Sequence, residues 1–166
     1  MAYIFNNCSS LEFLDLSNFD TLQVTKMTFS FNGCSSLKSL NLSNFFTPNL
    51  ENMAYIFNNC SSLTTLDLSN FDTCEVTKMS YSFSGLSSLK SLNLSNFQTP
   101  NLITIAYTFF NSSSLESIGL SNFDASKVTN MACAFNGCKS LKSLNLSNFV
   151  TSNLTNMAIF LIIVVL

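Results

Sequence analysis

Histidine, arginine and tryptophan are absent from this chain of 166 residues, and charged residues make up only 10% of it. The absence of histidine removes the commonest general base and the commonest metal ligand from the sequence. Seven scattered lysines and a net charge of −2 leave no basic patch, so we expect no nucleic-acid partner. The sequence therefore favours a protein that is not an enzyme, and we expect no cofactor and no metal.

A secretory signal is also missing, since the first residues carry no basic region followed by a long apolar stretch. The first methionine instead shares one register with five others, at Met1, Met27, Met53, Met79, Met131 and Met157. The chain thus opens inside a repeat pattern, which favours a fragment of a longer protein. The alternatives are a small protein exported by another route and one that stays inside the cell.

A strict period of 26 residues is the strongest feature that is present. Phenylalanine recurs with this spacing at Phe19, Phe45, Phe71, Phe97, Phe123 and Phe149. Leucine does the same from Leu11 to Leu141 and from Leu16 to Leu146. Six copies fill residues 1–156 without an insertion or deletion, from repeat 1 (1–26) to repeat 6 (131–156). Each copy must stack on an equivalent neighbour, because one copy cannot bury its own apolar face.

The first half of each repeat predicts a short β-strand. In Leu40-Asn41-Leu42 the leucines alternate with an outward asparagine, which is the period of a strand. Stacked repeats would align these strands into one parallel sheet with rungs about 4.8 Å apart. The sequence therefore predicts a solenoid of six coils over residues 1–156, with short parallel strands.

The second half of each repeat leaves two alternatives. Val24, Met27 and Phe31 fit one face of a helix, whereas Met27, Phe29 and Phe31 fit a strand. Prolines and many Ser, Asn and Thr residues argue against a long helix in this half. We expect a short second strand there and a tight helical turn after Phe31.

The consensus M-x-x-x-F-x-x-C-S-S-L-x-x-L-x-L-S-N-F-x-T-x-x-V-T-x-M, which covers residues 1–156, resembles the BspA-like leucine-rich repeats and the related repeats of mycoplasma-type surface lipoproteins. The resemblance implies a right-handed leucine-rich-repeat solenoid and a microbial cell-surface role in adhesion or host contact. Ordinary leucine-rich repeats place an inward asparagine where this chain has Phe45, and Asn44 comes one residue earlier. We therefore expect a phenylalanine spine in place of the asparagine ladder.

The repeated Phe and Ser-Asn positions predict packing in preference to ligand binding. The phenylalanine columns that contain Phe5 and Phe19 each keep one register, as interior residues do. Ser17-Asn18 and its copies are expected to bond the backbone where each strand turns. An aromatic groove and a repeated ligand-facing patch are the respective alternatives.

The six cysteines predict neither a structural disulfide nor a zinc site. Four of them share one repeat position, namely Cys8, Cys34, Cys60 and Cys138. Other repeats carry Leu86 or Ser112 there, so this is a packing position, and no C-x-x-C pair is present. Stacked cysteines would also hold their side chains parallel, which is poor disulfide geometry. We expect buried free thiols.

The outward strand positions are the best candidate for a binding surface, because solenoids generally bind along their sheet face. Two outward columns supply eleven residues, which we call the sheet-face residues: Glu12, Lys38, Thr64, Lys90, Glu116 and Lys142 in one, and Asp15, Asn41, Asp67, Asn93 and Asn145 in the other. Glu12–Lys38 and Lys90–Glu116 are expected to be neighbouring ion pairs. A protein or glycan ligand would read several repeats at once. The alternative is a solvated polar face without a ligand.

Residues 157–166 leave the repeat pattern and are almost entirely apolar. The run is too short to span a bilayer. It is either an apolar cap over the last coil or the start of a truncated membrane anchor, and membrane contact is expected only in the second case. The whole pattern favours a binding or adhesion scaffold. A structural array that associates end to end is the alternative.

Overall fold

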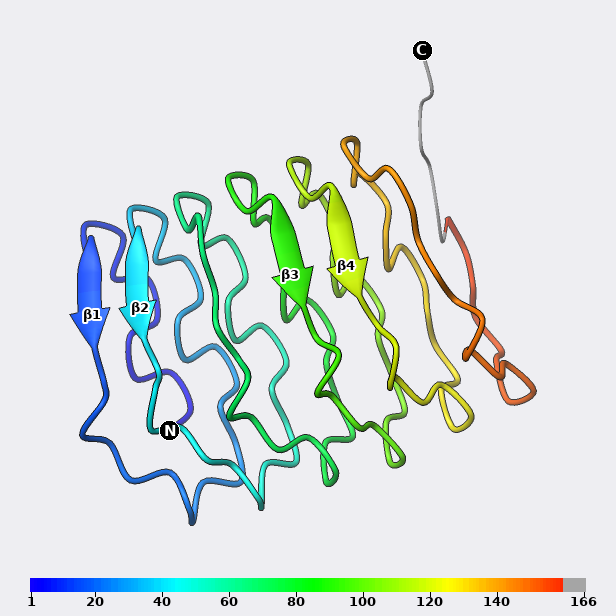
Figure 1. The fold of residues 1–166 in the computed structure, drawn as a ribbon, viewed down its shortest axis with the longest axis horizontal. Coiled ribbons are helices and arrows are strands. Elements are labelled where there is room, and N and C mark those ends of the chain that lie inside the picture. Colours follow the sequence, from blue (N-terminus) through cyan, green and yellow to red (C-terminus); the bar gives the residue numbers. More distant parts are fainter. Residues whose placement is uncertain (160–166) are drawn as a thin grey trace.

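The structure is a computed structural model that describes residues 1–159. Figure 1 shows the repeats stacked side by side in sequence order, from the first in blue to the last in red. Residues 26 apart in the sequence are therefore neighbours in space, as in the pairing of Leu14 with Leu40. The chain buries its apolar residues between successive repeats, in line with the prediction from its period.

Four short strands lie on one side of the stack: β1 (Phe13–Asp15), β2 (Ser39–Asn41), β3 (Ser91–Asn93) and β4 (Ser117–Gly119). β1 pairs in parallel with β2, and β3 pairs in parallel with β4. Each strand is short because a turn follows at once. In repeat 1 the carboxylate of Asp15 accepts a hydrogen bond from the backbone N–H of Ser17 at 2.9 Å, which turns the chain away from the sheet.

The sheet is split in two, so the prediction of one continuous sheet is wrong. The two pairs form separate two-stranded sheets, and the structure assigns no strand between β2 and β3. The interval belongs to repeat 3, where residues 64–68 hold the position of a strand without forming one. This break creates the candidate site described below.

The opposite side of the stack, which we call the return side, is held by a column of single-residue parallel bridges. They run without a break from Lys26–Asn52 through Asn52–Lys78, Lys78–Thr104 and Thr104–Asn130 to Asn130–Asn156. Turns follow, closed by hydrogen bonds such as that from Cys34 N to Phe31 O at 3.2 Å. Residues 1–159 contain no helix. In place of the expected second strand, each repeat has one bridging residue. In place of the expected helical turn, it has a hydrogen-bonded turn that is not helical.

Leucine and phenylalanine columns fill the interior, as the sequence predicts. The bulkiest buried rings are Phe31, Phe45, Phe57, Phe83, Phe97, Phe109, Phe123 and Phe135. Successive rings stack, and those of Phe31 and Phe57 lie 5.3 Å apart with planes inclined by 4°. Two end members of the column differ, since Phe19 is 39% exposed and Phe149 is half-buried. They lie in the outermost repeats, where only one neighbour covers them.

An asparagine ladder accompanies the phenylalanine columns, so the expectation that phenylalanine replaces it is wrong. In every repeat after the first, the asparagine of the Ser-Asn pair donates its side-chain N–H to a serine carbonyl of the preceding repeat. The donors are Asn44, Asn70, Asn96, Asn122 and Asn148. Phenylalanine occupies the inward position, and asparagine, one residue earlier, bonds the backbone at the turn. The expected backbone-bonding role of these asparagines is confirmed.

All six cysteines are free thiols. The buried cysteines at the shared repeat position make weak hydrogen bonds to carbonyl oxygens of the preceding repeat. The thiol of Cys34, for example, donates to the carbonyl oxygen of Phe5 at 3.1 Å. Burial raises the pKa of the Cys34 and Cys138 thiols to about 11. The prediction of burial is wrong for two of the six, since Cys8 is exposed and Cys74 is half-buried.

No helix in residues 1–159 has the length and the apolar character needed to cross a bilayer. The apolar run that could be a cap or an anchor lies outside the described residues from residue 160 onwards.

Candidate functional site

The sheet-face residues do share one side of the stack. Ten of the eleven are exposed, and Glu116 is half-buried. They do not form one uniform strip, because the break at repeat 3 separates those on β1 and β2 from those on β3 and β4. The two columns also make different interactions. The first contains ion pairs between repeats, and the second accepts hydrogen bonds that close the turns after the strands.

In the first column, charged residues pair between neighbouring repeats. Lys38 lies 2.8 Å from the carboxylate of Glu12, as predicted. Glu116 pairs with Lys142 rather than with Lys90, and its hydrogen bond and charge interaction with Lys142 lower the pKa of the Glu116 carboxyl. These pairs are largely exposed to solvent, so they contribute little to stability. Lys90 is left exposed beside the break.

In the second column, each side chain uses one oxygen to close the turn after the strand. The five acceptors are Asp15, Asn41, Asp67, Asn93 and Asn145, and each donor is the backbone N–H two residues later. The bond from Ser69 lowers the pKa of the Asp67 carboxyl, which is therefore ionised at neutral pH. The amide nitrogen of Asn93 makes no hydrogen bond within the described residues.

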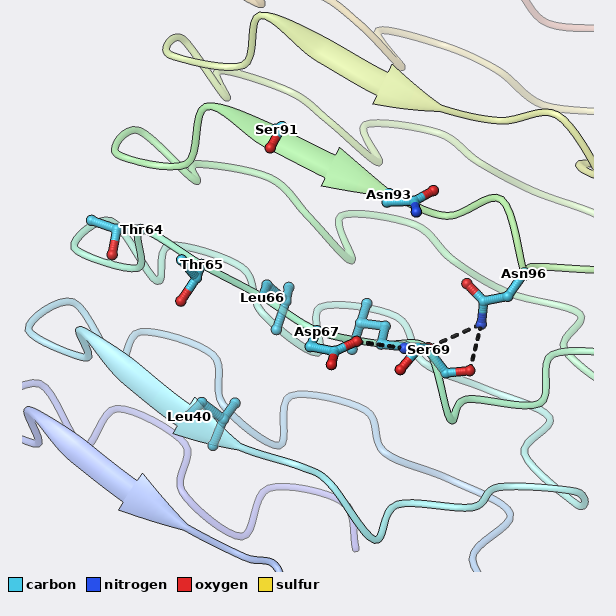
Figure 2. Close-up of a pocket in the computed structure, with 10 residues that line it drawn as sticks. Leu40, Thr64, Thr65, Leu66, Asp67, Ser69, Ser91, Asn93 and Asn96 are labelled. Atoms are coloured by element: carbon cyan, nitrogen blue, oxygen red, sulfur yellow. Dashed lines mark hydrogen bonds between the residues drawn. The ribbon is translucent and has the colours of Figure 1, made fainter.

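A groove of about 350 Å³ lies over the break, and we call it the repeat-3 groove (Figure 2). Residues from β2, from repeat 3 and from β3 with the turn after it line the groove: Leu40, Thr64, Thr65, Leu66, Asp67, Leu68, Ser69, Ser91, Asn93 and Asn96. A second hollow of about 340 Å³ shares Ser69 and Asn96 and continues to the exposed ring of Phe46. Together they form a trough that follows repeat 3 along its strand position and turn.

The groove exists because repeat 3 lacks the backbone rungs that join other repeats on this side. Lys38 N donates to Glu12 O at 2.8 Å, and the same bond joins Glu116 to Lys90 at 2.7 Å. Within residues 1–159 no equivalent bond joins Thr64 to either neighbouring repeat. The opening reaches the core, since Leu40 and Leu66 are half-buried whereas Leu92 in the same column is buried. No single residue explains why repeat 3 does not pair.

The groove combines an apolar floor with a polar, nearly neutral rim. Leu40 and Leu66 form the floor, and Asp67 is the one charged residue among those that line it. On the rim Asn96 donates to the carbonyls of Leu68 and Ser69 at 3.0 and 3.3 Å, which leaves its amide oxygen free of partners within the described residues (Figure 2). Such a site can bind by hydrogen bonds and apolar contact. Among residues 1–159 no group of three or more Cys, Asp or Glu side chains could hold a metal ion.

Three of the sheet-face residues therefore lie in the groove, namely Thr64, Asp67 and Asn93. The leucine floor is not predictable from the sequence, because every repeat carries an inward leucine or isoleucine at the position of Leu66. The sequence carries one signal: Thr64 interrupts a column that is otherwise occupied by Lys and Glu. It marks repeat 3 as different without indicating that the sheet opens there.

Residues 1–119 and 77–161 match the model of a mycoplasma protein family of unknown function, DUF285. The chain belongs to this family. The resemblance to the mycoplasma-type repeats is thereby confirmed. No curated protein matches this DUF285 member.

Among solved structures, a leucine-rich repeat protein from Bacteroides ovatus resembles this DUF285 member with a TM-score of 0.56 and 18% sequence identity. The match covers 86% of this chain and 33% of that protein, so the chain spans about a third of its length. At this identity the likeness shows the fold alone. The fold is that of a leucine-rich repeat protein with short parallel strands.

Proposed function

We propose that this chain is a non-catalytic binding scaffold of a microbial cell surface, which engages a protein or glycan partner through its sheet face. In this proposal six right-handed coils form a rigid support, and the repeat-3 groove is the place where the partner is held. The family and the fold support the scaffold role, because repeat proteins of this kind bind through extended surfaces. The adhesion role and the surface location rest on the resemblance of the repeats.

The observation that carries the proposal is the groove itself. It is a place on the sheet face where half-buried leucines, exposed threonine and serine residues and the side-chain amides of Asn93 and Asn96 meet. A partner that is polar but uncharged fits these groups best, because Asp67 supplies the only charge. A sugar ring offers hydroxyl groups at its edge and C–H groups on its face, and a polar loop of a protein offers a similar mixture. The neighbouring repeats add exposed lysines and carboxylates on both sides.

The experiment is a binding screen of the purified chain against glycans and microbial and host surface proteins, followed by a matched pair of variants. Thr65→Phe fills the groove with a residue that repeat 1 carries at the same strand position, as Phe13, so the fold should tolerate it. Ser143→Phe makes the same kind of change in repeat 6, outside the groove. We expect Thr65→Phe to weaken binding at least tenfold and Ser143→Phe to leave it unchanged. Equal binding by both variants would place the partner elsewhere on the molecule.

A further inference from the structure

All four tyrosines of this chain lie in one column of stacked aromatic rings on the return side. The column runs Tyr3, Phe29, Tyr55, Tyr81 and Tyr107. The ring centroids of Tyr55 and Tyr81 are 4.6 Å apart, and those of Tyr81 and Tyr107 are 4.5 Å apart. The planes are nearly parallel, at 9° and 3°. Three phenols are thus consecutive, whereas the benzene ring of Phe29 separates Tyr3 from them.

The backbone holds these rings in place in an unusual way. Each ring residue of the column has a left-handed backbone, with φ between 57° and 62°. Bulky side chains rarely adopt this conformation. The other left-handed position of the repeat carries asparagine or glycine, such as Asn59 and Gly85, which adopt it readily. The same position is left-handed at Cys133 and Ile159, so the conformation belongs to the turn of every repeat, where the surroundings enforce it.

Rungs on both sides of the column enforce the arrangement. Tyr55 N donates to Ser80 O at 2.9 Å, Tyr81 N donates to Ala106 O at 3.2 Å, and Tyr107 N donates to Ala132 O at 2.8 Å. These bonds hold the backbones of successive repeats in register at the three tyrosines. All three tyrosines are only half-buried, so an oxidant in solution reaches them.

We propose that Tyr55, Tyr81 and Tyr107 form a site of oxidative cross-linking, where a one-electron oxidant such as a peroxidase intermediate joins neighbouring tyrosines through their ortho carbons. Each phenol gives up one electron and one proton and becomes a phenoxyl radical. Two neighbouring radicals form a carbon–carbon bond, and each bonded ortho carbon then releases its proton while the phenol oxygen regains one. The product keeps both hydroxyl groups and has lost two hydrogen atoms, which two equivalents of the oxidant take up.

Face-to-face stacking favours this reaction, because the unpaired electron of a phenoxyl radical lies in orbitals perpendicular to the ring. The stacked rings hold the π faces of neighbouring tyrosines together, with centroids 4.6 and 4.5 Å apart. Phenols are protonated at neutral pH, and desolvation raises the pKa of Tyr81 further, so oxidation releases a proton. The link would add a covalent bond on the side where backbone hydrogen bonds, such as that from Tyr55 N to Ser80 O, join the repeats.

The test treats dilute chain with photogenerated ruthenium(III) tris-bipyridine and persulfate. Its readouts on the monomer are dityrosine fluorescence, a mass loss of two hydrogen atoms per link, and peptide mapping. We expect links between Tyr55 and Tyr81 and between Tyr81 and Tyr107, together with a higher melting temperature. The chain has no tryptophan to obscure the fluorescence.

Three variants decide the assignment. Tyr81→Phe keeps the stacked ring but leaves no two phenols adjacent, so monomeric links should disappear. Tyr3→Phe removes a phenol outside the run of three and should leave the yield unchanged. Phe29→Tyr joins Tyr3 to the run and should add a link that mapping places at residue 29. The proposal is overturned if Tyr81→Phe monomers form links as readily as the wild type. It is equally overturned if the wild type forms none under conditions that couple free tyrosine.

Discussion

At the scale of single residues, each side chain of the stack meets the equivalent side chain of the next repeat. Rings stack on rings, as Phe31 does on Phe57, and amides bond amides, as Asn58 does with Asn32 at 2.7 Å. Like charges cannot stack in this way, because two charges one rung apart repel each other in every repeat. This explains why only 10% of the residues are charged. It also explains why the column of Glu12 and Lys38 alternates in sign or inserts threonine.

The buried thiols predict a dependence of stability on alkaline pH. The pKa of the Cys34 and Cys138 thiols is raised from 9 to about 11 by burial. Between these values the folded chain keeps protons that the unfolded chain releases, so the free energy of unfolding should fall as the pH rises from about 9 to 11. Serine at both positions should flatten this decline. Ser112 already occupies the equivalent position of repeat 5 and donates to Phe83 O at 2.6 Å, so the fold should accept the change.

Urea denaturation of the wild type and of the Cys34→Ser/Cys138→Ser variant at several pH values checks this expectation. The difference between the two proteins at pH 7 reports the loss of packing, and only the difference in slope above pH 9 reports titration. Parallel curves through the alkaline range would show that these thiols do not contribute.

At the scale of the structural elements, the turns carry more hydrogen bonds between repeats than the strands do. Three of the four strands, β1, β2 and β3, end at an Asp or Asn whose side chain closes the following turn, whereas β4 ends at Gly119. After β2 and β3 the ladder asparagine comes three residues later. The ladder spans all six repeats, whereas strand pairing is interrupted at repeat 3 and resumes between β3 and β4. The turns therefore keep the repeats in register where the sheet is open.

Replacing one ladder donor tests this role. Asn70 donates to the carbonyl oxygen of Ser43 at 2.6 Å. Asn70→Asp places a carboxylate oxygen against that carbonyl and should destabilise the chain by about 1–3 kcal/mol at pH 7. A protonated carboxyl can donate again, so the pKa of the introduced group is raised in the folded chain. The loss should be absent at low pH and should appear as the pH rises through that pKa.

The matched control is Asn18→Asp, because Asn18 makes no such bond within the described residues. Urea denaturation at about pH 3 and pH 7 separates the two variants, with acid effects on the other carboxyls common to both. An Asn70→Asp variant as stable as Asn18→Asp at pH 7 would contradict a ladder that holds the repeats together.

The 26-residue period predicts the buried columns correctly for repeats that have a neighbour on both sides, as at Phe45 and Leu42, because every such repeat buries these positions. The period does not predict the open sheet at repeat 3. Thr64 and Thr65 are β-branched, so local preference favours a strand there. Strand pairing depends instead on the distance between neighbouring repeats, and the packing of every residue column contributes to that distance. The candidate site is therefore predictable as a face, through Thr64, Asp67 and Asn93, but not as a groove.

At the scale of the whole molecule, each repeat contacts only its two neighbours, so stability is a sum of repeats and of the interfaces between them. The bridges on the return side join every successive pair of repeats from Lys26 to Asn156. A change in the number of repeats should thus leave the rest of the stack intact, provided that the register is kept.

Deleting residues 53–78 removes one full period, so that Asn52 precedes Met79 as Lys78 does in the intact chain. Phe45 would then stack on Phe97 in place of Phe71, and the ladder would continue across the new junction. We expect a folded chain with a cooperative urea transition and an m-value lower by roughly a sixth, since m scales with the surface exposed on unfolding. Circular dichroism in a urea titration measures both quantities.

The matched control deletes residues 59–71, which is half a period. Every later column then shifts against its neighbour, so strand positions face bridge positions and buried phenylalanines face polar turns. This shorter deletion should abolish the cooperative transition, although it removes fewer residues. If the half-period deletion folds as cooperatively as the full-period one, register between repeats does not hold the stack together. If both deletions fail to fold, the repeats depend on more than their nearest neighbours, and the one-dimensional account of this chain is wrong.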